Sequence, residues 1–296
     1  MPEWKGVIAA IVTPMKDGGN AVDPEPLGPY CDFLIEKGVD GLFALGTTGE
    51  GPVLSVPERK AMAGDLVARV NGRVKVIIQT GCITARETIE LTRHCRDAGA
   101  DAAGVVLPYY YRLDEEEIFR HFARIADGVP GFPLFVYDIP DCTGNDLTPA
   151  LFRRLIDEIE TIVGLKTSSS DLFRVRDCVR AAGDRCPVFV GCDSLILPVL
   201  LSGARGIVSG TASAFPEPFV RIYRAFEKGD LGKSREHQAF IDRLVEATGD
   251  GDIALFKKAL AFRGVEAGTV REPHRSLSPG EEAALRASLE ELGLIP

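Results

Sequence analysis

Residues 133–168 read PLFVYDIPDCTGNDLTPALFRRLIDEIETIVGLKTS, and this stretch decides the fold that we expect. Its two ends, residues 133–140 and 162–168, are apolar almost throughout, as in strands of a parallel sheet that is covered on both faces. Between them, Thr148 followed by Pro149 marks a helix start, with an N-cap residue before a proline at the first helical position. The stretch therefore predicts two parallel strands joined by a helix.

Six further apolar runs of this kind lie along the 296 residues, and helical patterns separate them. They cover residues 6–14, 39–46, 75–81, 101–108, 187–193 and 205–211. Capping-box patterns begin helices at Ser55 and Thr84, and another helix start lies at Ser278. Eight strands, each followed by a helix, close into a (β/α)8 barrel, also called a TIM barrel, of about 250 residues. We predict this α/β barrel over residues 1–228 and a C-terminal helical extension packed on it over residues 229–296.

An open, doubly wound sheet is the alternative architecture for alternating strands and helices. Such a sheet usually carries a glycine-rich dinucleotide fingerprint after its first strand, and residues 13–19, TPMKDGG, do not form one. The sequence also contains no phosphate-binding GxxxxGK[ST] motif. The barrel is therefore the preferred prediction.

Composition and charge limit the classes of partner and cofactor. The net charge of −9 argues against a nucleic acid or an anionic membrane as the main partner. Seven scattered cysteines without a CxxC motif, together with four scattered histidines, favour reduced thiols over disulfides or a zinc site. The sequence shows neither a run of 18 apolar residues nor a signal-peptide pattern, so we expect a cytoplasmic protein without a membrane span, metal or cofactor.

Polar residues at the ends of the apolar runs are the first candidates for a functional site, because active sites of such barrels lie at the C-terminal ends of the strands. Lys166 interrupts a run that otherwise resembles a buried strand. Burial disfavours the ammonium form and leaves a neutral amine that can attack a carbonyl carbon. The alternative is a lysine at a strand end that simply reaches solvent.

Three other strand ends carry polar groups. The turn at residues 46–51, GTTGEG, offers backbone N–H groups and two hydroxyls, which suits a carboxylate or phosphate, although a turn without a ligand is equally possible. Tyr137 can relay a proton to a nearby lysine or be a core residue, and Asp138 points to the opposite side of the strand. Residues 108–111, PYYY, add phenols that can serve the site or a subunit contact.

Together these motifs resemble the dihydrodipicolinate synthase and N-acetylneuraminate lyase family of class I aldolases, over essentially the whole chain. The matching residues, in order, are GTTGE at 46–50, PYY at 108–110, Tyr137 with Pro140 and Thr143-Gly144, and Gly164-Leu165-Lys166. The resemblance implies that Lys166 forms an imine with the 2-oxo carbon of pyruvate or a pyruvate-like substrate. A protonated imine accepts the electrons of the carbanion formed at C3.

The resemblance also implies roles for other residues. Tyr137 relays protons, and Thr47 bridges it to Tyr110 of the partner subunit in a homotetramer built from two tight dimers. Thr47 and Thr48 hold the substrate carboxylate. Further positions line the pyruvate pocket with backbone groups and apolar surface, namely Gly191 and Val208.

Departures from the family pattern bear on the substrate. Cys142 stands where the lysine-pathway synthases carry an arginine that binds a substrate carboxylate, and a thiol cannot replace that pair of hydrogen bonds. Residues 143–151, TGNDLTPAL, look closer to bacterial 2-keto-3-deoxy sugar-acid aldolases. Asp138 and Tyr111 replace common asparagines, and residues 167–170, TSSS, follow the lysine where many relatives have an acidic residue. We therefore rank a 2-keto-3-deoxy sugar-acid aldolase first, 4-hydroxy-tetrahydrodipicolinate (dihydrodipicolinate) synthase second and an N-acetylneuraminate lyase third.

Two alternatives lie outside this class of enzyme. A phosphate-binding barrel isomerase needs a cation or glycine-rich turn after the last strands, where residues 210–213, GTAS, offer only hydroxyls and backbone. A non-catalytic barrel that binds a 2-oxo acid has no need of Lys166 or Tyr137. Because both residues are present, catalysis is favoured.

Overall fold

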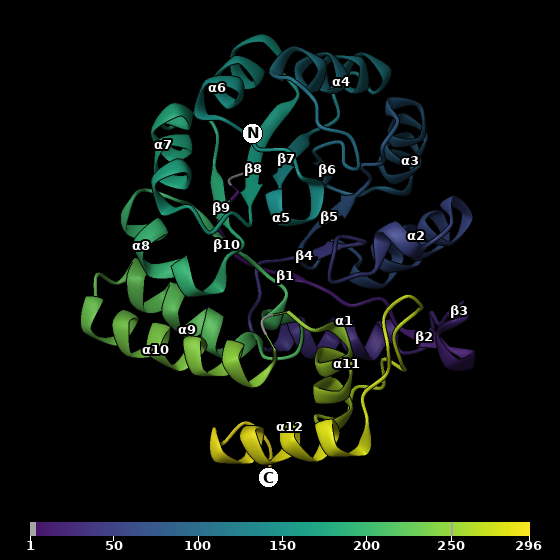
Figure 1. The fold of residues 1–296 in the computed structure, drawn as a ribbon, viewed down its shortest axis with the longest axis vertical. Coiled ribbons are helices and arrows are strands. Elements are labelled where there is room, and N and C mark those ends of the chain that lie inside the picture. Colours follow the sequence, from purple (N-terminus) through teal and green to yellow (C-terminus); the bar gives the residue numbers. More distant parts are fainter. Residues whose placement is uncertain (1–3, 250) are drawn as a thin grey trace.

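The computed structural model describes residues 4–249 and 251–296. Its centre is a closed barrel of parallel strands in the order β1-β10-β9-β8-β7-β6-β5-β4 (Figure 1). The barrel strands are β1 (Gly6–Ala10), β4 (Gly41–Ala44), β5 (Lys75–Gln79), β6 (Ala102–Val106), β7 (Leu134–Asp138), β8 (Ile162–Thr167), β9 (Val188–Val190) and β10 (Gly206–Ser209). Each of the eight predicted apolar runs contains one of these strands, so the predicted TIM barrel is confirmed.

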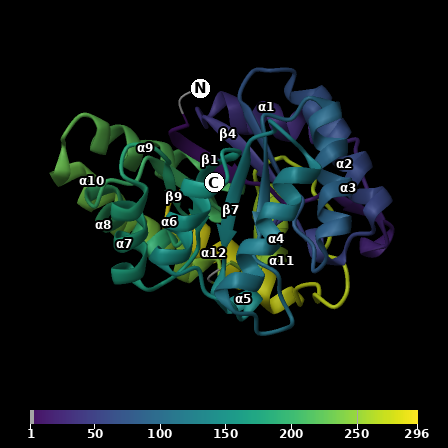
Figure 2. The same ribbon diagram turned by 90° about the horizontal axis from the view of Figure 1, so that it is seen from above.

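A ring of helices covers the outside of the barrel, with α2 and α3 on one flank and α7 to α9 on the other (Figure 2). The helices of the ring are α1 (Leu27–Glu36), α2 (Val56–Val70), α3 (Ala85–Ala98), α4 (Glu115–Gly128), α6 (Pro149–Glu158), α7 (Leu172–Ala182), α8 (Ile196–Leu201) and α9 (Pro216–Glu227). Ser55 forms the predicted capping box with Glu58, and Thr148 caps α6. Thr84 also caps its helix, α3, but the predicted capping box is incomplete. The Glu87 carboxylate accepts a hydrogen bond from the Thr84 hydroxyl at 3.0 Å instead of one from the Thr84 backbone N–H.

Three more helices follow the ring, as expected for a C-terminal extension: α10 (Leu231–Ala247), α11 (Ile253–Phe262) and α12 (Pro279–Glu291). Ser278 forms the capping box that begins α12, which packs beside α11 at the edge of the molecule (Figure 1). The boundary that we placed at residues 228 and 229 falls between α9 and α10 and stays a prediction. Among the described residues, no helix is both long and apolar enough to span a membrane.

Two short features were not predicted. Strands β2 (Met15–Lys16) and β3 (Ala21–Val22) form a small hairpin outside the barrel, and α5 (Pro140–Thr143) follows β7 directly. Elements of two to four residues are too short to show a strand or helix period in the sequence. Neither the hairpin nor α5 could therefore be predicted from a period in the sequence.

Aromatic rings fill the interior of the barrel and form the floor beneath its C-terminal end. Trp4, Phe43, Phe135 and Phe189 belong to one buried cluster that also contains Tyr137. Gly164 is a glycine because a Cβ at this position would lie 2.0 Å from the Phe135 ring. The packed rings thus support the strand that carries the lysine two residues later.

Candidate active site

Lys166 lies at the C-terminal end of β8, opposite Tyr137 of β7 in the strand register. Its side chain is 5% exposed, and its Nζ atom lies 4.0 Å from the centre of the Tyr137 ring and 4.2 Å from that of Phe43. Burial lowers the pKa of the Lys166 ammonium from 10.5 to about 7, although the carboxylate of Asp193 acts in the opposite direction. A substantial fraction of this amine is therefore neutral near pH 7 and able to attack a carbonyl carbon.

Tyr137 places its phenol beside the Lys166 amine. Its side chain is 2% exposed, and its hydroxyl shares a hydrogen bond of 3.2 Å with the Thr47 Oγ1 atom. Burial raises the pKa of the Tyr137 phenol to about 12, while the hydrogen bond with Thr47 lowers it. The phenol therefore keeps its proton near neutral pH and can pass it along the Tyr137–Thr47 pair.

A cavity of about 340 Å³ opens beside Lys166 at the C-terminal ends of the strands. Seven of the eight residues that we named from the sequence line it: Thr47, Thr48, Tyr137, Cys142, Lys166, Gly191 and Val208. The volume lies within the range of small-molecule sites, which is about 300–1,000 Å³. The structure thus gathers residues from β7, β8 and β10, from the turns after β4 and β9, and from α5 around one cavity.

Tyr110 is the predicted site residue that does not line the cavity of its own chain. Its side chain is 82% exposed, and its ring packs edge-on against Tyr111 with a distance of 5.0 Å between the ring centres. Its φ of 80° lies in the left-handed region, which is unusual for a tyrosine. The contribution of Tyr110 to the site of a second subunit stays a prediction.

Several lining residues were not predicted as site residues: Ile139, Asp141, Ser168, Ser170, Cys192, Asp193, Ser194, Gly210, Thr211, Gly251 and Phe256. Asp193 could have been found, because it is a polar residue at the end of the apolar run 187–193. Its carboxylate accepts a hydrogen bond from the Ser209 hydroxyl at 2.9 Å, and its backbone carbonyl accepts one from the Gln238 side chain at 2.9 Å. These bonds fix a negative charge in the wall of the cavity.

The turn with Thr47 and Thr48 is anchored from the C-terminal part of the chain. Glu50 in this turn is buried, and its carboxylate forms an ion pair of 2.5 Å with Lys257 of α11. The same carboxylate accepts a hydrogen bond of 2.7 Å from the backbone N–H of Arg271. The C-terminal helices therefore help to hold the two threonines in place.

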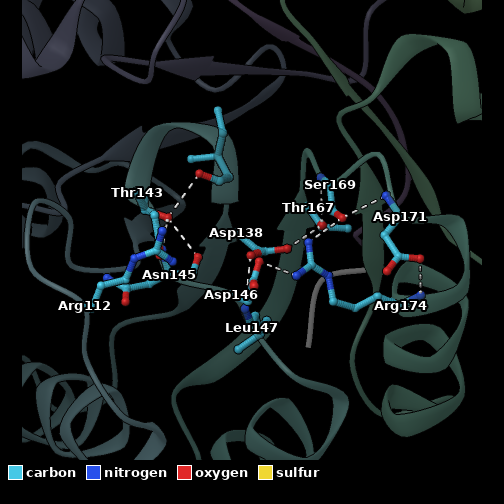
Figure 3. Close-up of polar contacts among 12 residues, drawn as sticks. Arg112, Asp138, Thr143, Asn145, Asp146, Leu147, Thr167, Ser169, Asp171 and Arg174 are labelled. Atoms are coloured by element: carbon cyan, nitrogen blue, oxygen red, sulfur yellow. Dashed lines mark hydrogen bonds and ion pairs between the residues drawn. The ribbon is translucent and has the colours of Figure 1, made fainter.

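Asp138 lies on the other side of β7 from Tyr137, as the alternation of a strand predicts. Its buried carboxylate accepts a hydrogen bond of 2.8 Å from Thr167 and one of 3.3 Å from the backbone N–H of Leu147 (Figure 3). Burial raises the pKa of the Asp138 carboxyl. Asp138 thus joins the ends of β7 and β8 behind the cavity.

Within residues 4–249 and 251–296, no group of three or more histidine, cysteine, aspartate or glutamate side chains is placed to hold a metal ion. The reactive groups of the cavity are an amine, a phenol, hydroxyls, carboxylates and the thiols of Cys142 and Cys192.

A parallel barrel with a buried, partly neutral lysine beside a tyrosine–threonine pair is the arrangement of a class I aldolase, an enzyme that works through a Schiff base. The chain matches the dihydrodipicolinate synthetase family over residues 3–292 and belongs to that family of Schiff-base pyruvate aldolases. It is therefore an enzyme, a class I aldolase or lyase.

Relatives with known names support the family assignment over nearly the whole chain. A 4-hydroxy-tetrahydrodipicolinate synthase from Thermomicrobium roseum is 38% identical over 96% of this chain and 93% of its own length. An uncharacterized DapA-like lyase from Halobacterium salinarum is 36% identical over 98% of this chain and 94% of its own. Among solved structures, the prophage protein YagE of E. coli K12, crystallised with pyruvate, has a TM-score of 0.94 and 32% identity, and the match covers 98% of this chain and 99% of YagE.

Proposed function

We propose that the enzyme cleaves a 2-keto-3-deoxy sugar acid into pyruvate and an aldehyde, through an imine on Lys166. The observation that carries this proposal is the buried amine of Lys166, which faces a cavity and has a pKa of about 7. The pyruvate complex of the E. coli relative supports a 2-oxo acid as the ligand. Thr47, Thr48, Gly191 and Val208 all line the cavity, and we expect the two threonines to bind the carboxylate of the 2-oxo acid.

The proposed reaction uses the groups of the cavity and no external cofactor. The neutral amine of Lys166 attacks the C2 carbonyl, and loss of water leaves a protonated imine. Tyr137 gives its phenolic proton to the departing water and becomes a phenolate, which then takes the proton from the C4 hydroxyl. The C3–C4 bond breaks, and the electron pair of that bond moves toward the imine to give an enamine. The aldehyde leaves, C3 gains a proton, and water releases pyruvate from Lys166.

The side chains that line the cavity are suited to a polyhydroxylated substrate. Four hydroxyl side chains can hydrogen-bond the sugar hydroxyls: Ser168, Ser170, Ser194 and Thr211. Asp141 and Asp193 are the acidic lining residues, and Lys166 is the one basic side chain among the described residues that line the cavity. A second substrate carboxylate would therefore meet carboxylates and hydroxyls instead of a cation, which disfavours aspartate semialdehyde.

The alternative function is 4-hydroxy-tetrahydrodipicolinate synthase, the name of the relative that is 38% identical. Cys142 separates the two functions, because it lines the cavity where the synthases are expected to place an arginine. We expect the wild-type enzyme to release pyruvate from 2-keto-3-deoxy sugar acids and to condense pyruvate with aspartate semialdehyde only feebly. Cys142→Arg should shift the ratio of the two kcat/KM values toward the semialdehyde by about 30- to 150-fold, the value of a charge-assisted hydrogen-bonded pair.

The matched control for this experiment is Cys142→Ser, which changes the side chain without adding a charge and should leave the ratio unchanged. Asp141, beside the new cation in the cavity wall, can reduce the gain by pairing with it. A wild-type synthase activity with kcat/KM of about 10⁴ M⁻¹s⁻¹ or more would overturn the preferred function.

Tyr110 completes the proposed proton relay across a subunit interface of a homotetramer. We expect Tyr110→Phe to lower turnover by about 10²-fold or more, the usual contribution of a general acid or base, with little loss of thermal stability. Steady-state kinetics on the assembled variant would measure this effect, and Tyr111→Phe, at an adjacent exposed ring, is the control. Unchanged turnover in a correctly assembled Tyr110→Phe variant would leave Tyr110 as a subunit contact only.

A further inference from the structure

Asn145 holds the loop that carries Tyr110. Its side chain is buried, and its amide nitrogen donates hydrogen bonds to the backbone carbonyls of Pro108 and Tyr111, both at 2.8 Å. Its amide oxygen accepts a third bond, from the backbone N–H of Leu113 at 2.9 Å. Both donor hydrogens of the amide and its oxygen are thus used on one loop, residues 108–113, which follows β6.

This loop needs such support because Tyr110 has an unfavourable backbone conformation. A φ of 80° in a residue other than glycine is strained and persists only when neighbouring contacts enforce it. The side chains of Tyr110 and Tyr111 are 82% and 63% exposed, so packing within the chain contributes little. The two carbonyls that Asn145 binds flank Tyr110 on both sides, so these bonds hold the backbone from which its side chain projects.

Asn145 is itself firmly placed. The Thr143 hydroxyl donates to the backbone carbonyl of Asn145 at 2.9 Å, and the backbone N–H of Leu147 donates to Asp138 at the end of β7. Asp146, between them, forms an ion pair with Arg174 of α7 (Figure 3). The segment at residues 143–147 therefore connects the Tyr110 loop to the end of the strand that carries Tyr137.

We propose that Asn145 is a positioning residue for turnover, which acts by fixing the Tyr110 hydroxyl where the neighbouring active site needs it. Asn145 does not line the cavity, and the three hydrogen bonds of its side-chain amide all go to the loop at residues 108–113, so we expect it to act through this loop. The inference rests on the proposed role of Tyr110 in the proton relay. It assigns to Asn145 an effect on the rate of proton transfer, whereas the final amount of imine on Lys166 should stay unchanged.

Asn145→Asp is the sharpest test, because it keeps an acceptor for the N–H of Leu113 and replaces the two donors with an oxygen that repels the carbonyls of Pro108 and Tyr111. We expect kcat to fall by about 10-fold or more, as for a small misplacement of a reacting group, while KM changes by less than about threefold. Borohydride treatment with pyruvate should still give a full adduct on Lys166. Hydrogen exchange of residues 108–113, measured by mass spectrometry, should become faster.

A double-mutant cycle separates positioning from a general loss of structure. In the Tyr110→Phe background, Asn145→Asp should cause no further loss of kcat, because the hydroxyl that it positions is already absent. Asn20→Ala, which removes a surface amide bonded to the carbonyl of Asp17, is the control for loss of an asparagine side chain. Unchanged kcat in Asn145→Asp, or an equal loss in both backgrounds, would overturn the inference.

The proposed function can be judged separately in the same experiment. Wild-type turnover in Tyr110→Phe would also overturn the role of Asn145, whereas the pyruvate adduct on Lys166 reports on the imine chemistry alone. If Asn145→Asp folds poorly, Asn145→Ser, which retains one donor, should give an intermediate kcat and an intermediate exchange rate. An Asn145→Ser variant with the full loss of kcat but the hydrogen-exchange rate of the wild type would contradict the proposed positioning role of Asn145.

Discussion

Replacing Lys166 with methionine should reduce pyruvate release by on the order of 10⁴-fold or more, because the variant has no amine to form the imine. Methionine is of similar length and suits the apolar surroundings between the rings of Tyr137 and Phe43. Electrospray mass spectrometry after borohydride treatment with pyruvate should show a stable adduct on wild-type Lys166 and none on the variant. A full adduct on the Lys166→Met variant would mean that another lysine carries the reaction.

Lys166→Arg and Lys228→Met are the controls for charge and for loss of a lysine. Arginine keeps the positive charge but cannot lose its proton in a protein, so Lys166→Arg should be as inactive as the methionine variant. Lys228 is exposed at the end of α9, and its replacement should leave the adduct and the turnover unchanged. Near-normal turnover in Lys166→Arg would show that the lysine supplies only charge.

The same amine gives the wild-type enzyme a pH dependence. Since the reactive form is neutral and burial lowers the pKa of Lys166 to about 7, the rate of imine formation should rise between about pH 6 and pH 8 and then level off. In the unfolded chain this lysine binds its proton up to about 10.5, so its burial reduces stability most below pH 7. Lys166→Met removes that cost, and its Tm at pH 7 should be at least as high as that of the wild type.

The sequence predicts the barrel and the centre of the site for physical reasons that act locally. A strand covered on both faces must be apolar throughout, so the single charged residue of β8, Lys166, is visible as an exception. Tyr137 is found in the same way at the end of β7, and the parallel register places the two side by side. Local periodicity therefore identifies the strands, and strand ends identify the residues around the cavity.

Contacts between distant segments leave no such pattern. Phe256 and Gly251 reach the cavity from the C-terminal extension, and the helical period of that region does not say where it folds back. The contacts of Asn145 could not be predicted, because its three partners are backbone groups of a loop more than 30 residues away in the sequence. The partner of Glu50 could not be predicted for the same reason, since Lys257 lies far along the chain in α11 and no local period connects the two residues.

Disruption of the buried ion pair between Glu50 and Lys257 has the largest expected effect on the free energy of unfolding. Lys257 is 1% exposed, and its Nζ atom contacts Glu50 at 2.5 Å and the backbone carbonyl of Thr269 at 2.7 Å. Lys257→Met should lower the free energy of unfolding by about 3–5 kcal/mol, because the Glu50 carboxylate would stay buried without its cation. Thermal and urea unfolding would measure this loss, and KM for pyruvate should rise because Glu50 belongs to the turn that carries Thr47 and Thr48.

The neighbouring ion pair between Lys258 and Glu282 is a matched control on the same helix, since both of its side chains are about one-third exposed. Lys258→Met should cost less than about 1 kcal/mol, because an exposed pair gains little over its hydrated ions. The double variant Glu50→Gln and Lys257→Met should regain part of the stability, because a neutral amide is cheaper to bury than an unpaired carboxylate. Equal effects of Lys257→Met and Lys258→Met would show that the ion pair with Glu50 does not anchor the turn, and that the threonines are held by the barrel alone.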